Sequence, residues 1–183
     1  SEVDRLLEKL EELVRKVRRD VEENVKKNDE LAKEVERLSK RNVERNEELA
    51  KEIEDLARRG DSRLEDLIKE IEKESRDSDR RSKEELRRIK EESKRSDDES
   101  EKKLKEIEDE VRKLLKDADD RGLSEELKEK VKRVMEKVKR VLDRVREEDE
   151  KSHRKADRVL REVEKRDRDS HERLRKVLDD VRR

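Results

Sequence analysis

The most regular feature of the sequence is a stripe of apolar residues that recurs every three or four positions. It runs through residues 3–21 and continues, with polar interruptions, through residues 24–56, 64–111 and 141–163. Apolar residues at this spacing lie on one face of an α-helix. Helix-forming Glu, Lys, Arg and Leu fill most other positions. The pattern therefore predicts an all-α fold.

The stripe is built from a repeat that spans five whole turns of an α-helix, or about 18 residues at 3.6 residues per turn. Asn24 and Asn28, for example, fall on Asn42 and Asn46. The aligned segments are residues 23–40 with 41–58, 75–92 with 93–110, and 141–153 with 159–171. A strict heptad repeat imposes a left-handed supercoil, whereas a period that matches whole helical turns leaves helices nearly straight. We therefore predict straight helices.

Two glycines divide the chain into three helical segments of similar length. Gly60 and Gly122 suit the left-handed residue that ends a helix, and Ser62 with Glu65 reads as a capping box. Short loops make neighbouring helices antiparallel. We expect one domain, residues 1–183, that forms a straight up-down-up antiparallel three-helix bundle with helices of about 57 residues. The predicted helices are residues 2–59, 62–120 and 124–182.

The width of the apolar stripe differs among the three predicted helices. The stripe is wide on residues 2–59, slightly narrower on residues 124–182 and narrowest on residues 62–120. A symmetric bundle would use similar widths on all three helices. The middle helix therefore lies at the periphery of the bundle, or the other two helices also face a further packing partner. We expect a monomer, and the alternatives are self-association or a partner helix.

Polar residues interrupt the stripe at two levels, and folding the chain at its two loops brings them together. The first polar layer is Asn24, Asn28, Ser93, Ser96, Ser100, Asp149, Ser152 and His153. The second polar layer is Asn42, Asn46, Ser75, Ser78, Ser82, Asp167, Ser170 and His171. An unpaired buried polar group is destabilising, so such layers penalise misaligned helices. A solvated face is the plainer alternative, but these residues replace apolar ones within the stripe.

Composition removes several classes of function. Charged residues make up 63% of the chain, yet the net charge is −1, which is unlike a typical disordered segment. Without cysteine there are no disulfides, thiol catalysts or Cys-based metal sites. Near-neutral charge and the lack of aromatic residues give no reason to expect nucleic acid. No apolar run is long enough to span a membrane, and the mixed-sign polar face does not favour a membrane surface at neutral pH.

The whole chain resembles the de novo designed helical bundles that contain modular layers of buried hydrogen-bond networks. The resemblance rests on the duplicated polar layers, the two glycine loops and the Glu, Lys and Arg surface. It implies a soluble structural scaffold or switch module, without a natural activity or a cofactor. Members of this family with buried histidines act as pH switches, so loss of order near pH 5 through His153 and His171 is an alternative hypothesis.

Catalysis and metal binding are weaker hypotheses. Asp149, Ser152 and His153 contain the residue types of a hydrolase triad, but Ser152 and His153 are adjacent on a helix and point about 100° apart. No oxyanion hole is evident, because helix-interior N–H groups are already bonded. One His and one Asp per layer are too few to ligate a metal within one chain. We predict no enzyme activity, no catalytic residues and no metal site.

Overall fold

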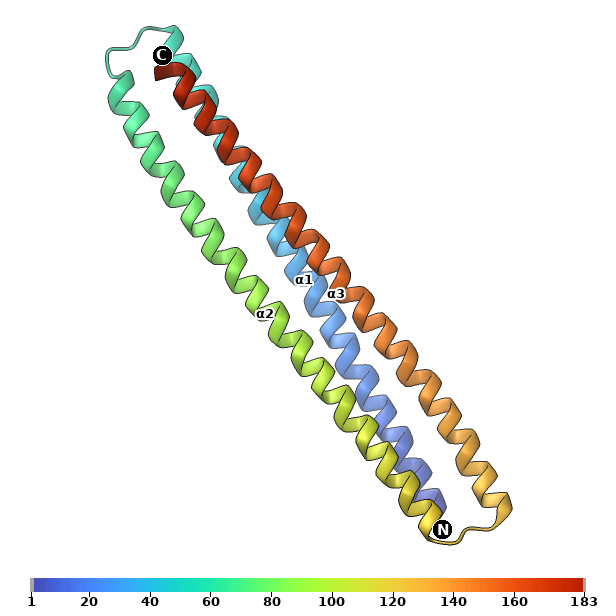
Figure 1. The fold of residues 1–183 in the computed structure, drawn as a ribbon. Coiled ribbons are helices and arrows are strands. Elements are labelled where there is room, and N and C mark those ends of the chain that lie inside the picture. The colour runs from blue at the N-terminus through green and yellow to red at the C-terminus, as the bar shows by residue number, and fades with distance from the viewer. Residues whose placement is uncertain (1, 183) are drawn as a thin grey trace. The chain divides into compact units, whose positions relative to one another are not determined.

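The chain folds into three long helices joined by short loops (Figure 1). The computed structural model describes residues 2–182, without the side chains of residues 2, 3 and 118. The helices are α1 (Glu2–Arg58), α2 (Leu64–Asp120) and α3 (Glu125–Arg182), with 57, 57 and 58 residues. These bounds confirm the predicted all-α fold and the predicted helix length.

Both glycines end their helices in the left-handed conformation that their position predicted. The φ angle is 61° at Gly60 and 64° at Gly122, where a side chain would be strained. At the end of α1, the N–H of Gly60 donates to Ala57 O at 3.2 Å and the N–H of Asp61 donates to Leu56 O at 3.4 Å. This pair of bonds is a Schellman motif, which satisfies carbonyls that the helix leaves open.

The start of α2 differs from the predicted capping box of Ser62 and Glu65. The side chain of Asp61 accepts the N–H of Arg63 at 2.9 Å, and α2 begins at Leu64 rather than at residue 62. An aspartate carboxylate readily accepts an N–H two residues along the chain, so Asp61 takes the role that we assigned to Ser62. The hydrogen bond from the Arg63 backbone is also the main cause of the lowered pKa of Asp61.

Tertiary contacts divide the chain into two compact units, and each contains a segment of all three helices. The first unit combines residues up to Asp29 with residues 93–155, and the second combines residues 30–92 with residues from Ala156 onward. The helix directions follow from the side-chain contacts inside each unit. We describe the two units separately below.

Within both units, α1 and α3 run parallel and α2 runs antiparallel to them. In the first unit Asn24 bonds to Asp149 and Asn28 bonds to Ser152, so residue numbers rise together. Ser96 and Lys103 of α2 contact Asn24 and Asp20 of α1, so numbers run oppositely. The second unit has the same order. Ser39 and Asn46 of α1 contact Asp167 and Ser170 of α3, so numbers rise together. Asn42 and Arg45 of α1 contact Ser78 and Glu74 of α2, so numbers run oppositely. The up-down-up three-helix arrangement is therefore confirmed.

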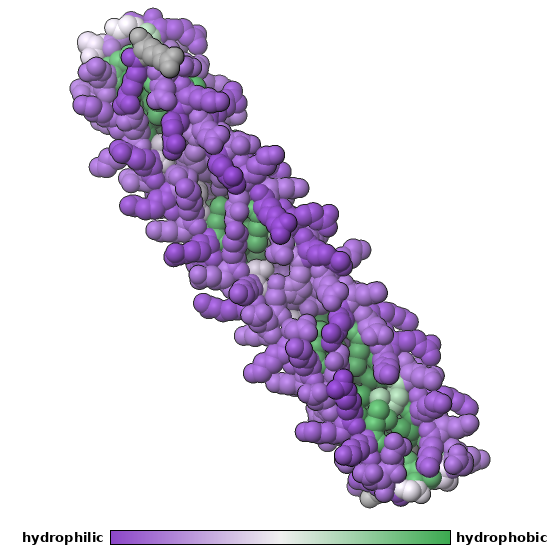
Figure 2. All heavy atoms as spheres, in the orientation of Figure 1, coloured by the Kyte–Doolittle hydropathy of each residue, from purple (hydrophilic) through white to green (hydrophobic). Residues whose placement is uncertain are grey.

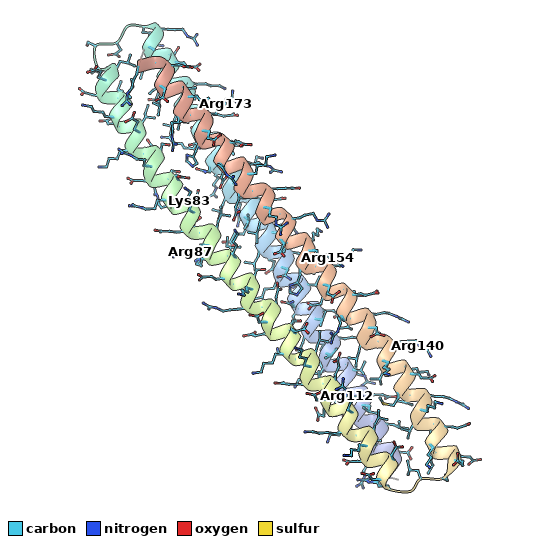
Figure 3. All side chains as sticks on the ribbon, viewed as in Figure 1. Lys83, Arg87, Arg112, Arg140, Arg154 and Arg173 are labelled. Atoms are coloured by element: carbon cyan, nitrogen blue, oxygen red, sulfur yellow. The ribbon has the colours of Figure 1, made fainter. Side chains whose placement is uncertain are left out.

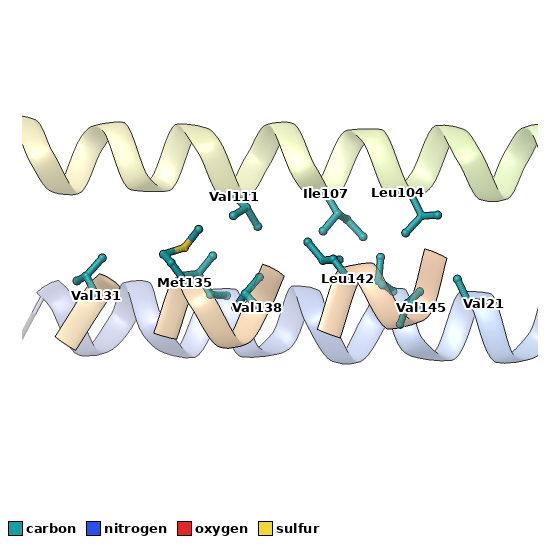
Figure 4. Packing of buried hydrophobic residues seen from close by; sticks show 11 residues of the cluster. Val21, Leu104, Ile107, Val111, Val131, Met135, Val138, Leu142 and Val145 are labelled. Atoms are coloured by element: carbon teal, nitrogen blue, oxygen red, sulfur yellow. The ribbon is translucent and has the colours of Figure 1, made fainter. Parts of the chain in front are cut away.

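The apolar stripes meet inside each unit and form its core. In the first unit, leucine, isoleucine, valine and methionine side chains from all three helices interdigitate between α2 and the pair α1 and α3 (Figure 4). That cluster includes Leu10, Val17, Leu104, Ile107 and Leu142. The second unit contains two clusters, one around Val35, Ile89 and Val163, and the other around Ile53, Ile71 and Leu174. The second polar layer separates these two clusters along the helices.

Charged side chains cover the outside of all three helices. Figure 2 shows hydrophilic side chains over most of the visible face, with apolar atoms reaching the surface only in depressions between helices. Figure 3 shows side chains such as Arg112, Arg140 and Arg154 projecting outward. Most ion pairs between them are well exposed, and such pairs each contribute only about 0–1 kcal/mol. The mixed charge therefore serves mainly to keep this surface solvated.

Candidate functional site: two buried polar layers

Asp149 is the centre of the first polar layer. Asn24 Nδ2 donates to Asp149 Oδ1 at 2.9 Å, and Ser100 Oγ donates to Asp149 Oδ2 at 3.1 Å. The hydroxyl of Ser96 donates to Asn24 Oδ1, so the amide is used on both sides. One network thus joins α1, α2 and α3 at a single level of the first unit.

His153 lies between two carboxylates in the first layer. Its Nε2 lies 3.2 Å from Asp149 Oδ2, and its Nδ1 contacts Asp97 Oδ2 on α2. A carboxylate only accepts hydrogen bonds, and both ring nitrogens donate only when the imidazole carries two protons. This arrangement therefore favours the positively charged form of His153, which forms a bridge between α2 and α3.

The second polar layer repeats the composition of the first layer but not its bonding. Ser78 Oγ donates to Asn42 Oδ1 at 3.0 Å, and Asn42 Nδ2 lies 3.4 Å from Nε2 of His171. The same Nε2 lies 3.2 Å from Asp79 Oδ1. His171 therefore contacts one carboxylate, through one ring nitrogen, where His153 contacts two.

The two layers also differ at position 39, whose equivalent in the preceding repeat is position 21. Val21 is buried in the first unit, whereas Ser39 is buried in the second and donates to Asp167 Oδ1 at 2.9 Å. In the first layer, by contrast, Asp149 receives its bond from α1 through Asn24. The change from valine to serine thus gives Asp167 an additional partner on α1.

The two central aspartates have pKa values shifted in opposite directions. Burial acts to raise the pKa of Asp149, but hydrogen bonds from His153 and Asn24, the charge of His153 and the Ser100 hydroxyl together lower it below the ordinary 3.8. Burial also acts to raise the pKa of Asp167, and there it outweighs the bonds from Ser39 and Asn42 and the charge of His171. The first layer therefore stabilises its carboxylate ion, and the second layer stabilises the neutral acid.

A second asparagine in each layer pairs with a serine on α3. Asn28 Nδ2 donates to Ser152 Oγ at 3.3 Å, and Asn46 Nδ2 donates to Ser170 Oγ at 3.0 Å. The carbonyl oxygens of both asparagines are buried without a hydrogen-bond partner in the structure. Each asparagine is therefore satisfied on its nitrogen side only.

The structure brings the predicted layer residues together in their two levels, with different degrees of burial. Those classed as buried are Asn24, Asn28, Asn42, Asn46, Ser93, Ser100, Asp149, Ser152, Asp167 and His171. Those that are half-buried are Ser75, Ser78, Ser82, Ser96, His153 and Ser170. Within the described part of the chain, Ser75, Ser82 and Ser93 make no side-chain hydrogen bond. These three serines therefore add polarity to α2 without joining the networks.

Three members of the networks were not predicted from the sequence, namely Ser39, Asp79 and Asp97. Ser39 falls one repeat after Val21, so alignment of the repeats marks it as a polar residue at a stripe position. Asp79 and Asp97 are themselves separated by one repeat, and they lie beside Ser78 and Ser96. The repeat therefore marked these three positions in the sequence. An aspartate on such a highly charged helix is nevertheless hard to distinguish from the aspartates of the solvated surface.

The chemistry of the layers consists of hydrogen bonding and ion pairing. Ser152 Oγ is bonded to Asn28, whereas His153 faces two carboxylates, so the hydroxyl and the imidazole have different partners. Among the described residues, no group of three or more His, Cys, Asp or Glu side chains is placed to hold a metal ion. Within the same residues, no helix has a stretch apolar enough to cross a membrane.

Comparison with known proteins supports the fold. No protein-family model matches the sequence, and no curated protein matches it. A solved structure described as a computationally designed three helix bundle is similar, with a TM-score of 0.65 and 13% sequence identity, covering 99% of this chain and 93% of that chain. At this identity the likeness concerns the fold alone. It confirms the three-helix bundle and, at that level, the resemblance to designed helical bundles.

Proposed function

We propose that this chain is a designed structural scaffold, without a natural biochemical activity, whose two polar layers fix the register of its three helices. The observation that carries the proposal is the network around Asp149, which joins Asn24 of α1, Ser100 of α2 and His153 of α3. A change of register would separate these groups and leave them buried without partners. The designed neighbour and the bundle fold support a structural rather than a catalytic role.

The free energies of the hydrogen bonds in the layers favour a role in specificity rather than in stability. A satisfied hydrogen bond contributes only about 0.5–1.5 kcal/mol net, whereas an unsatisfied buried group costs about 1–3 kcal/mol. The apolar clusters of each unit consist mostly of Leu, Ile and Val, which pack acceptably in several registers. The layers are therefore the feature that distinguishes one alignment from the others.

A variant with apolar layers tests this proposal. Replacing Asn24, Asn42, Asp149 and Asp167 by leucine removes the central group of each network, and Val35→Leu serves as a control inside an apolar cluster. We expect the layer variant to keep its helix content but lose the single set of methyl NMR signals that the parent and control show. A single sharp set from the layer variant would contradict the proposal.

A response to acid is a second candidate function, favoured by the position of His153 between Asp97 and Asp149. A neutral imidazole donates to only one of these carboxylates, whereas the protonated ring donates to both, so acid changes this contact. Comparing unfolding midpoints at pH 7.5 and pH 5 in the parent and in a variant with His153 and His171 replaced by asparagine tests this candidate. Equal shifts in the two proteins would exclude a histidine-dependent response.

A further inference from the structure

The groove between α1 and α3 in the second unit is the most apolar of the large grooves in that unit. Its volume is about 520 Å³, and its walls include Val43, Asn46 and Ala50 of α1 and Ser170, Leu174 and Val177 of α3. We call it the α1/α3 groove. The groove between α2 and α3 is similar in size, about 490 Å³, but Leu86 is the one apolar residue in its lining. Apolar side chains are thus more numerous in the lining between α1 and α3.

Half-buried apolar side chains recur on these two helices with the period of the sequence repeat. The recurring positions are Leu7, Val25 and Val43 on α1 and Val141, Val159 and Val177 on α3. No half-buried apolar position recurs at this spacing among the described side chains of α2. The wider stripes of α1 and α3 are therefore only partly covered by the contacts within the chain.

An asparagine that lines the groove has a buried side-chain oxygen without a hydrogen-bond partner. Asn46 lines the groove, is only 2% exposed, and its Oδ1 has no hydrogen-bond partner in the structure. Asn28, its equivalent in the first unit, is 1% exposed and has the same unpaired Oδ1. A buried carbonyl without a donor is destabilising, and here the defect occurs at both copies of one position.

We propose that the α1/α3 face binds a second copy of this chain and forms a two-fold symmetric dimer with parallel helices. Two copies would contribute α1 and α3 to a four-helix core and leave the narrower stripe of α2 outside. Because Asn46 and Ser170 are bonded within one chain, they lie at the same level. A parallel two-fold axis keeps that level, so groove residues of one copy meet groove residues at the same level of the other.

The charges at the groove favour this occupant. The α1 edge carries Glu47, Lys51 and Glu54, and the α3 edge carries Arg166, Asp169 and Arg173. The α1 edge is therefore net negative and the α3 edge net positive. A parallel two-fold axis places the α1 edge of each copy against the α3 edge of its partner, so opposite charges meet on both sides.

The mass of the protein in solution tests the proposal directly. Sedimentation equilibrium from micromolar to hundred-micromolar concentration should give twice the 22.3 kDa mass of the chain. A mass of one chain over this whole range would overturn the proposal and point to a different partner for the groove. A mass of three or more chains would also overturn it, since a two-fold axis admits two copies.

Two variants locate the interface on the α1/α3 groove. Val43→Glu and Val177→Glu place a charge at half-buried groove positions, and Leu86→Glu is the matched control on α2. We expect the groove variants to sediment as single chains with unchanged helical circular dichroism, and the control to remain dimeric. A dimer that survives both groove substitutions would overturn the proposed face.

A third variant tests the interface even if Val43→Glu and Val177→Glu prevent folding. Glu47→Arg combined with Glu54→Arg changes exposed residues whose ion pairs with Arg173 and Arg58 lie at the surface, so the cost to the bundle itself should be small. Both edges of the groove then become positive, and the two copies should associate about tenfold more weakly at low salt. Unchanged association at low salt would contradict the proposed pairing of α1 and α3 edges.

Discussion

Asn24 Nδ2 on α1 lies 2.9 Å from Asp149 Oδ1 on α3, and both side chains are buried. Replacing Asn24 by leucine removes a donor from a buried carboxylate. We expect Asn24→Leu to lower the free energy of unfolding by about 1–3 kcal/mol. Chemical denaturation with guanidinium chloride measures this loss.

A double variant measures the interaction between Asn24 and Asp149 apart from their contacts with other residues. Asn24→Leu combined with Asp149→Leu should cost less than the sum of the two single substitutions, because neither residue is then left without the other. Additive costs would mean that the bond between Asn24 and Asp149 contributes no coupling.

Ser39 is the residue that distinguishes the second layer from the first. Ser39→Val removes its bond to Asp167 and should lower the free energy of unfolding by about 1–2 kcal/mol. Ser93→Val is the matched control, because Ser93 is also buried but makes no side-chain hydrogen bond among the described residues. Thermal unfolding of both variants would show equal losses if the bond to Asp167 were unimportant.

The opposite pKa shifts of Asp149 and Asp167 predict opposite pH dependences. The pKa of Asp149 is lowered, so its ionised form stabilises the fold above the ordinary value of 3.8, and that stability is lost as pH falls through the lowered value. The pKa of Asp167 is raised, so its stabilising contribution is complete below 3.8 and is lost as pH rises through the raised value.

Asparagine variants make this difference measurable. At pH 7 we expect Asp149→Asn to destabilise the protein and Asp167→Asn to leave it unchanged or more stable. The difference between the parent and Asp149→Asn should disappear as pH falls through the lowered pKa of Asp149, below 3.8, and that between the parent and Asp167→Asn should disappear as pH falls from the raised pKa of Asp167 to 3.8. Unfolding curves that shift in the same direction for both variants would show that the two sites are equivalent.

The histidines should also differ in their contribution to stability. His153→Asn leaves Asp97 and Asp149 facing each other without the positive charge between them, whereas His171 contacts a single carboxylate. We expect His153→Asn to cost about 1–3 kcal/mol at pH 7 and His171→Asn to cost less. Denaturant midpoints of the two single variants provide the comparison, and a larger loss for His171→Asn would reverse this ranking.

The helices and their order could be predicted from the sequence because their determinants are local. Gly60 and Gly122 are the only glycines, and the apolar stripe fixes which face of each helix is buried. The period of the repeat also located the polar levels, because whole helical turns return a side chain to the same face. The predicted straightness of the helices stays a prediction.

The bonding within the layers could not be predicted, because it depends on which of several nearby donors reaches each acceptor. Asp79 and Asp97 look like surface residues until α3 places a histidine beside each of them. Ser39 bonds to Asp167 in addition to Asn42, which occupies the position from which Asn24 reaches Asp149. Side-chain partners of this kind are set by small differences in distance, which helical periodicity does not resolve.

The central claim is that the layers hold one register, and a distance between α1 and α2 tests it most directly. The chain has no cysteine, so Lys40→Cys and Glu84→Cys provide unique, exposed sites for spin labels in the second unit. Dilution with unlabelled protein removes distances between labels on different chains, so the measured distance is the one between the two labels of a single chain. A slip of one helical turn moves one label by about 5.4 Å, which double electron–electron resonance detects.

We predict one narrow distance distribution for the parent protein and a broad or multiple distribution when Asn24, Asn42, Asp149 and Asp167 are all leucine. An equally narrow distribution at the same distance in the leucine variant would contradict the claim that the polar layers set the register.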